Sequence, residues 1–169
     1  MECASNFSSM LEMSGRIHYM DDVDRKILAE LQSDGRLTLT ELADRVGLSV
    51  SPCHRRLRIL ERSGAISGYH AQLDAGALGL AFEALVFVTM RYEDRQTVAS
   101  FEQQVADIPN VLQAQRLFGD PDYLLRVVVR DLSAYRQLYD ERLATLPGVL
   151  RLNSTLVMKS LVDARPLPL

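Results

Sequence analysis

The sequence has few cysteines and no long apolar run. Cys3 and Cys53 are its only cysteines, too few for a disulfide framework or a cysteine-rich zinc site. It contains no run of about 18 apolar residues, which argues against a transmembrane helix. Residues 1–19 lack the basic start and apolar core of a secretory signal. We therefore expect a cytoplasmic protein with no metal and no membrane partner, preceded by a disordered tail over residues 1–19.

An excess of basic charge is also missing. The 169 residues include 19 Lys and Arg against 22 Asp and Glu, a net charge of -3. A chain with this balance has no global field that attracts nucleic acid, so any DNA-binding surface must be local. The hydrophobic share of 47% and the charged share of 24% are typical of a globular protein with one or two small domains.

The segment after residue 20 has the pattern of a helix-turn-helix. Apolar residues at helical spacing follow Asp21 and continue to about Ser33. Thr38 and Glu41 have the spacing of a capping box, which predicts a second, short helix that ends at Gly47. A short helix followed by a glycine turn and a third helix is typical of a helix-turn-helix unit.

The third helix, expected from Ser49 through Leu60, has an apolar side and a basic side. On a helical wheel Cys53 falls on the apolar side, as a core residue, and the arginines lie roughly opposite. The window 45–62 contains five arginines and one glutamate, so it is basic although the chain is acidic. The candidate DNA-contacting residues are Ser49, Ser51, Pro52, His54, Arg55, Arg58 and Arg62.

Two interpretations of this basic side are open. It is either an ordinary solvated surface or a surface that binds DNA. Guanidinium groups suit phosphates and guanine edges, and a helix N-terminus favours a phosphate. The preceding turn and short helix, and the near absence of acidic residues on this side, favour DNA binding.

The remaining sequence repeats a unit of strand and helix. The strings IPNV at 108–111 and LPGV at 146–149 each end a predicted helix, which follows a strand at 84–90 or 123–129 and precedes another strand. The order βαββαβ predicts a ferredoxin-like α+β domain with both helices on one sheet face. The strands are apolar on both faces, so we expect a second subunit to cover the other face. Residues 65–73 predict a further short strand.

The expected domain division is a DNA-binding domain at 20–70, a linker at 71–81, the ferredoxin-like domain at 82–162 and a tail at 163–169.

A known family has the same motifs in the same order. Over about residues 20 to 160 the sequence closely resembles the Lrp/AsnC (feast/famine) transcriptional regulators, through RKILAELQSDGRLTLTELADRVGLSVSPCHRRLRILERSGAISGYHAQLD, GDPDYLLRV, DLSAYRQL and LPGV. The resemblance implies a winged helix-turn-helix domain followed by a ferredoxin-like effector domain of the RAM or ACT-like type. It also implies homodimers formed sheet to sheet, which assemble into tetramers or octamers on double-stranded DNA, with an amino acid as effector and no cofactor.

The resemblance further implies an effector site at a contact between dimers, in the loop Gly119, Asp120, Pro121, Asp122 and Tyr123. A carboxylate of this loop suits the ammonium group of an amino acid, and the N–H groups of a glycine turn suit its carboxylate. Taken alone, the same loop is also a good hairpin turn, because proline presets the bend. Three further positions match the family's pocket: Leu132, Leu156 and Val157.

The arginine-bearing helix favours a DNA-binding protein, and the resemblance implies a sequence-specific regulator of amino-acid metabolism genes whose DNA binding or assembly responds to an effector. Two arginine-bearing helices on a two-fold dimer are expected to enter successive major grooves of a pseudo-palindromic operator. The alternative is an architectural protein that packs nucleoid DNA. A tetrapyrrole decarboxylase-like enzyme is disfavoured, because such chemistry needs His or Arg in a large cavity. His18 lies in the tail and His54 on the DNA-binding side, which leaves only His70, so no enzyme is expected.

Overall fold

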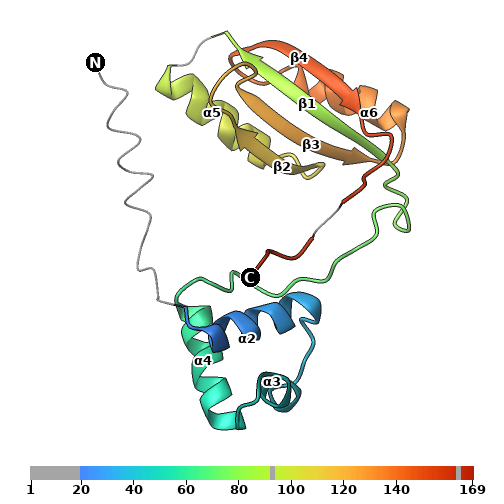
Figure 1. Ribbon diagram of the computed structural model, residues 1–169. Helices are drawn as coiled ribbons and strands as arrows, with labels where there is room; N and C mark the ends of the chain where they lie inside the picture. The colour runs from blue at the N-terminus through green and yellow to red at the C-terminus, as the bar shows by residue number, and fades with distance from the viewer. Residues whose placement is uncertain (1–19, 92–93, 163–164) are drawn as a thin grey trace. The chain divides into compact units, whose positions relative to one another are not determined.

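The chain forms two compact units, and the structure, a computed structural model, describes residues 20–91, 94–162 and 165–169 (Figure 1). The tail expected at the N-terminus lies outside these ranges. No helix in them is long and apolar enough to cross a membrane, and no group of three or more His, Cys, Asp or Glu in them is placed to hold a metal ion. The two units are Met1–Gln72 with Val162–Leu169, and Leu73–Leu161.

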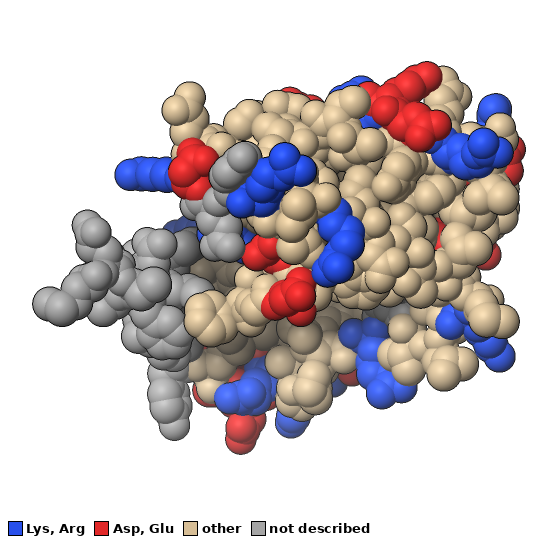
Figure 2. Space-filling view, turned by 90° about the horizontal axis from the view of Figure 1, so that it is seen from above, with Lys and Arg blue, Asp and Glu red and all other residues tan. Residues whose placement is uncertain are grey.

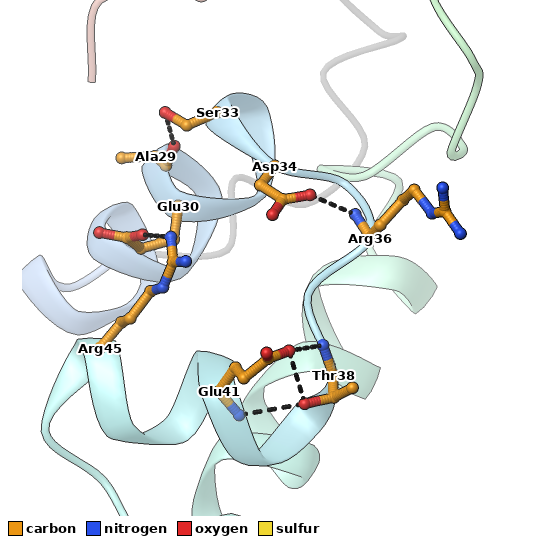
Figure 3. A network of polar contacts seen from close by, with 8 residues as sticks. All are labelled: Ala29, Glu30, Ser33, Asp34, Arg36, Thr38, Glu41 and Arg45. Atoms are coloured by element: carbon orange, nitrogen blue, oxygen red, sulfur yellow. Dashed lines mark hydrogen bonds and ion pairs between the residues drawn. The ribbon is translucent and has the colours of Figure 1, made fainter.

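The first unit contains the expected DNA-binding domain and is called the DNA-binding unit. Three helices build it, and local signals set their ends. Asp21 and Thr38 begin the first two helices in capping boxes, completed by Asp24 and Glu41 (Figure 3 shows the second box). Gly47 ends the second helix at φ 73°, a conformation that favours glycine. The helices predicted from the sequence are therefore confirmed. Their bounds are α2 (Asp22–Ser33), α3 (Leu39–Val46) and α4 (Val50–Arg62).

The three helices enclose a small apolar core. Ile27 of α2, Leu42 of α3 and Cys53 and Leu60 of α4 are at most 1% exposed. Burial raises the pKa of the Cys53 thiol, so this side chain acts as a small core residue. Because one side of α4 packs here, its opposite side faces solvent.

The short strand predicted for residues 65–73 is wrong. Within the described residues, the sheet contains no strand from this segment. Its beginning is instead held by α4, because the Ile66 N–H donates to the Leu60 carbonyl at 3.2 Å and the Ile66 side chain packs on the core. A strand needs a partner for its backbone groups, and alternation in the sequence does not reveal whether one lies alongside.

The second unit, Leu73–Leu161, contains the expected effector domain and is called the effector unit. It has the predicted βαββαβ order and an antiparallel sheet with the strand order β2-β3-β1-β4. This confirms the ferredoxin-like α+β fold. Its second helix continues into a π-helical turn. The elements are β1 (Phe82–Met90), α5 (Arg95–Ala106), β2 (Val111–Arg116), β3 (Tyr123–Val129), α6 (Leu132–Leu138), η1 (Tyr139–Leu143) and β4 (Val149–Leu156).

One face of this sheet is buried and the other is open within a single chain. Val86 in β1 and Leu125 in β3 are fully buried, in one core cluster with Phe101 of α5 and Tyr135 of α6. Both helices therefore cover the same face. The alternate residues of β1, such as Phe87, are only half-buried, and β2 and β4 are largely exposed. A second subunit over the open face stays a prediction.

Candidate nucleic-acid interface and effector site

The beginning of α4 is an exposed helix end that follows a tight turn. The Leu48 N–H donates to the Ala43 carbonyl at 2.9 Å, which closes the turn at Gly47. Ser49 is the N-cap residue but makes no side-chain cap hydrogen bond. The N–H groups of a first turn have no partner inside their helix, so this end suits an anionic group such as a phosphate.

The structure places the predicted DNA-contacting residues together along α4. Arg55 makes no hydrogen bond or ion pair with another described residue. Arg58 Nε donates to His54 Nε2 at 3.4 Å, and Arg58 Nη1 lies 3.7 Å from Glu61 Oε2. Because the Arg58 side chain is 64% exposed, this ion pair is weak and leaves the guanidinium available. Pro52 is half-buried in the first turn. The six exposed residues are Ser49, Ser51, His54, Arg55, Arg58 and Arg62.

Arg56, in contrast, stabilises the packing of the helices. Its Nη1 lies 2.8 Å from Asp24 Oδ1 and 2.8 Å from Asp21 Oδ2, and Asp24 is only 3% exposed. Hydrogen bonds to Asp24 and then Asp21 raise the pKa of the Arg56 guanidinium, while the Asp24 N–H chiefly lowers the pKa of Asp21. This cluster ties α4 to the start of α2. The available signal was the position of Arg56 on a helical wheel, where it falls near the edge of the apolar side and not on the basic side.

Arg45 is also paired with a carboxylate, so fewer of the arginines in the window 45–62 are free to contact a ligand. Its Nη1 lies 3.1 Å from Glu30 Oε2 (Figure 3). Arg45 and Arg56 thus both contact carboxylates near or in α2, and the freely exposed cations of α4 are Arg55, Arg58 and Arg62. On the face seen in Figure 2, acidic and basic side chains are mixed among uncharged ones, so that face has no comparable basic surface.

The loop between β2 and β3 is a closed hairpin that Asp122 fastens to β1. The Leu117 N–H donates to the Asp122 carbonyl at 2.7 Å, and the Asp120–Pro121 peptide is cis. The Asp122 N–H donates to the Val88 carbonyl at 2.9 Å, and the Met90 N–H donates to Asp122 Oδ2 at 2.7 Å. The Asp122 carboxylate therefore already has a backbone partner that holds the loop in place.

Asp120 is the more accessible carboxylate of this loop. Its side chain is 76% exposed, and Arg151 Nη2 lies 3.9 Å from its Oδ1. The Thr89 hydroxyl donates to the same oxygen at 3.4 Å. Gly119, just before it, has φ 138°, where a side chain is strained. Of the two carboxylates expected to meet an ammonium group, Asp120 is the one that solvent reaches freely.

Tyr123 turns from the loop into the helix-covered face. It is 4% exposed, its hydroxyl donates to Glu102 Oε1 at 2.8 Å, and its ring centroid lies 4.6 Å from that of Phe101. Burial, and then the hydrogen bond to Glu102, raises the pKa of Tyr123 to about 12. A groove of about 440 Å³ between α5 and β2 is lined by this side chain together with Val105 and Arg116.

The other predicted effector residues lie toward the opposite end of the sheet. Leu156 pairs with Ala84 at one end of β1, and Val157 follows it. Leu132 begins α6, just after the end of β3 that pairs with this same end of β1. The loop, in contrast, contacts Val88, about 13 Å along the strand from Ala84 at the usual rise per residue. One chain therefore presents the predicted effector residues as two separate groups along β1.

Known proteins match both units. Residues 20–67 match the family profile described as winged helix-turn-helix DNA-binding, and residues 83–167 match the one described as Lrp/AsnC ligand binding domain. The chain belongs to the Lrp/AsnC family. A Bkd operon transcriptional regulator of Pseudomonas aeruginosa is 41% identical over 143 residues, which cover 85% of this chain and 94% of that protein.

Two further relatives agree with this family membership. The leucine-responsive regulatory protein of Escherichia coli is 39% identical over 148 residues, which cover 88% of this chain and 90% of that protein. A transcriptional regulator of Neisseria meningitidis, solved as a complex with L-Met, has a TM-score of 0.84 at 36% identity and covers 88% of this chain and 96% of that one. This Lrp/AsnC protein is thus a transcriptional regulator with a DNA-binding and a ligand-binding domain.

Proposed function

We propose that this chain regulates genes of amino-acid metabolism by binding specific operators through α4, and that an amino acid modulates its DNA binding or assembly. The observation that carries this proposal is the exposed surface of Arg55, Arg58 and Arg62 opposite the buried side of α4. Guanidinium groups bind phosphates and guanine edges of the major groove. The relatives, a Bkd operon transcriptional regulator and a leucine-responsive regulatory protein, support gene regulation over the decarboxylase hypothesis.

The open sheet face supports a two-fold homodimer formed sheet to sheet. Phe87 in β1 and Leu124 in β3 are paired neighbours there and are half-buried in one chain. A two-fold dimer presents two copies of α4, and an operator of two half-sites roughly 34 Å apart fits them. Further association into tetramers or octamers allows the two groups of effector residues to come from different chains.

An amino acid effector suits the chemistry of these groups. Asp120 is an exposed carboxylate for the ammonium group, and the glycine turn at Gly119 offers N–H groups for the carboxylate. Leu132, Leu156 and Val157 supply apolar surface for a side chain. The relative from Neisseria meningitidis was solved with L-Met, which supports an amino acid of this kind.

Fluorescence anisotropy with DNA from upstream of the protein's own gene tests the DNA-binding role. The triple variant Arg55→Ala, Arg58→Ala, Arg62→Ala should bind roughly tenfold or more weakly, with a flatter salt dependence, because phosphate contacts release counterions. Arg95→Ala, an exposed arginine of α5, removes charge in the other unit and is the matched control.

Two outcomes contradict this proposal. Equal binding by the triple variant and the wild type removes α4 as the DNA-binding element. Equal competition by random DNA and by the operator fragment replaces sequence-specific regulation with the architectural alternative, because non-specific binding depends on phosphates alone.

A further inference from the structure

The last residues of this sequence contact the DNA-binding unit. Gln32, in the last turn of α2, donates from Nε2 to the Leu167 carbonyl at 3.3 Å, and the Leu167 N–H donates to Gln32 Oε1 at 2.6 Å. The two residues belong to the same compact unit, and Figure 1 shows the C-terminus beside α2. One side-chain amide thus pairs with both backbone groups of one residue, as a neighbouring strand does.

An apolar groove of about 390 Å³ lies at this contact. Leu31 of α2 and Ile66 and Tyr69 after α4 line it, together with Leu167 and Leu169. Leu31 and Ile66 also pack on the core of the unit, so the groove continues that core toward the surface. Leu167 is 71% exposed and Leu169 48% exposed. The segment therefore lies along the groove and not inside the core. Such a partly exposed contact is one that can form and release.

The sequence of this segment is suited to such a contact. Pro166 and Pro168 restrict φ and favour extended chain in the residues before them, so little backbone freedom is lost when the segment docks. Neither proline has an N–H group. The Leu167 N–H is therefore the only one between Arg165 and Leu169, and it is the one that Gln32 accepts.

We propose that residues 165–169 form a strap that docks in this groove and connects the two units a second time. The chain leaves the first unit before β1, and after β4 it returns, since Val162–Leu169 belongs to the first unit. A second connection limits the arrangements available to the two units, so less order has to be gained when an operator is bound. The effect on DNA binding rests on the proposed function, whereas the docking does not.

Chemical crosslinking of the full chain tests the docking. Gly35 lines the groove, and a Cβ atom there meets only the Leu31 carbonyl oxygen, at 3.8 Å. The variant Gly35→Cys, Leu169→Cys in a Cys3→Ser background should therefore give an intrachain product with a short bismaleimide, measured by intact mass. The buried Cys53 is inaccessible to the reagent. Leu169→Cys combined with Gln137→Cys, an exposed position of α6, gives the background yield.

Substitutions of Gln32 make this test specific. Gln32→Ala removes both hydrogen bonds and should lower the yield by about threefold, roughly the effect of one or two exposed hydrogen bonds. Gln32→Glu keeps the acceptor for the Leu167 N–H and loses the donor. Its crosslinking yield should therefore lie between the yields with Gln32 and with Gln32→Ala. A yield equal to background, a yield independent of residue 32, or an interchain product overturns the strap.

Operator binding by Gln32→Ala tests the second connection. We expect affinity about threefold weaker with an unchanged salt dependence, because Gln32 lies outside the arginine surface and loses no phosphate contact. Wild-type affinity together with a lowered crosslinking yield overturns the role of the strap in DNA binding. If the wild type itself does not recognise an operator, the proposed function fails, and the crosslinking result still decides whether the strap docks.

Discussion

In the DNA-binding unit the proposed functional surface belongs to one helix of one chain, whereas in the effector unit the proposed surface is divided. Helices α2, α3 and α4 bury their own core and leave Arg55, Arg58 and Arg62 exposed. The effector sheet leaves one face open and places the predicted pocket residues at two ends of β1. Under the proposed function, one chain presents its DNA-binding helix by itself, whereas a pocket built from both groups of effector residues would need a second chain.

The arginine–carboxylate pairs of the two units also lie in different surroundings. Arg56 contacts the nearly buried Asp24 and joins two helices of one chain. On the open sheet face, Arg126 makes two hydrogen bonds to Glu83, at 2.7 and 3.0 Å. In the proposed dimer a second subunit would meet this pair with both charges already neutralised, which lowers the desolvation cost of covering it.

The largest effect is expected from Phe87→Asp, which tests whether the effector unit is incomplete alone. Phe87 is half-buried in one chain, so the unit should still fold, but a carboxylate on the open face opposes burial against a second sheet. We expect loss of the dimer by sedimentation. Operator affinity should fall roughly 100-fold, because a single DNA-binding unit loses the advantage of two linked sites.

Ser133→Asp is the control for this change, because it adds the same charge at an exposed position of α6, on the helix-covered side of the sheet. It should leave both the dimer and the operator affinity unchanged. A Phe87→Asp protein that stays dimeric and binds DNA like the wild type contradicts a sheet-to-sheet dimer.

The next largest effect is expected from Arg56→Ala, which tests whether the DNA-binding unit depends on its internal pair. Removing Arg56 leaves Asp24, at 3% exposure, without this partner, and breaking such a pair from one side costs about 2 kcal/mol or more of the free energy of unfolding. Arg45→Ala breaks the exposed pair with Glu30 and should cost under about 1 kcal/mol. Urea unfolding measures both, and equal losses contradict a structural role specific to Arg56.

Local patterns in the sequence were sufficient to predict most of the fold. The capping box of Thr38 and Glu41, the glycine after α3 and the short, β-rich apolar runs of β1 and β3 each act within a few residues. Tyr123 shows a signal that was available but unused. It stands two residues before the buried Leu125 in β3, so the period of a strand places its side chain on the helix-covered face.

Features that depend on distant partners were not predictable in the same way. The alternation at residues 65–73 resembled a strand, but pairing requires a neighbour that this pattern does not specify. Arg56 finds Asp24 across 32 residues, and Leu167 finds Gln32 across 135. Asp122 looked like a free ligand for an ammonium group, yet the Met90 N–H binds its carboxylate. Such contacts follow from packing, which no local spacing encodes.

A smaller effect is expected at the effector loop, where Asp120 and Asp122 should differ. Asp120→Ala removes an exposed carboxylate and should weaken binding of an amino acid about tenfold without changing thermal stability, since its ion pair with Arg151 is long and exposed. Asp122→Ala leaves the Met90 N–H without its acceptor and should lower both stability and binding. Calorimetric titration of the twenty amino acids, beginning with L-methionine, measures the binding.

Binding heats that are equal for the wild type and Asp120→Ala remove this carboxylate from the site. Equal melting temperatures for Asp122→Ala and the wild type contradict its role in fastening the loop to β1.

The smallest effect is expected from Tyr123→Phe, and it is confined to alkaline pH and to the effector unit. The folded pKa of about 12 exceeds the ordinary value of 10.0, so the folded state holds the phenol proton more tightly. This contribution to stability is complete below pH 10 and is lost as the pH rises from 10 to 12. Tyr123→Phe lacks that loss, although it costs about 1 kcal/mol at neutral pH through the hydrogen bond to Glu102. Urea unfolding across this range should therefore show a flatter pH dependence for Tyr123→Phe than for the wild type. Parallel curves for the two proteins contradict a buried, proton-retaining Tyr123.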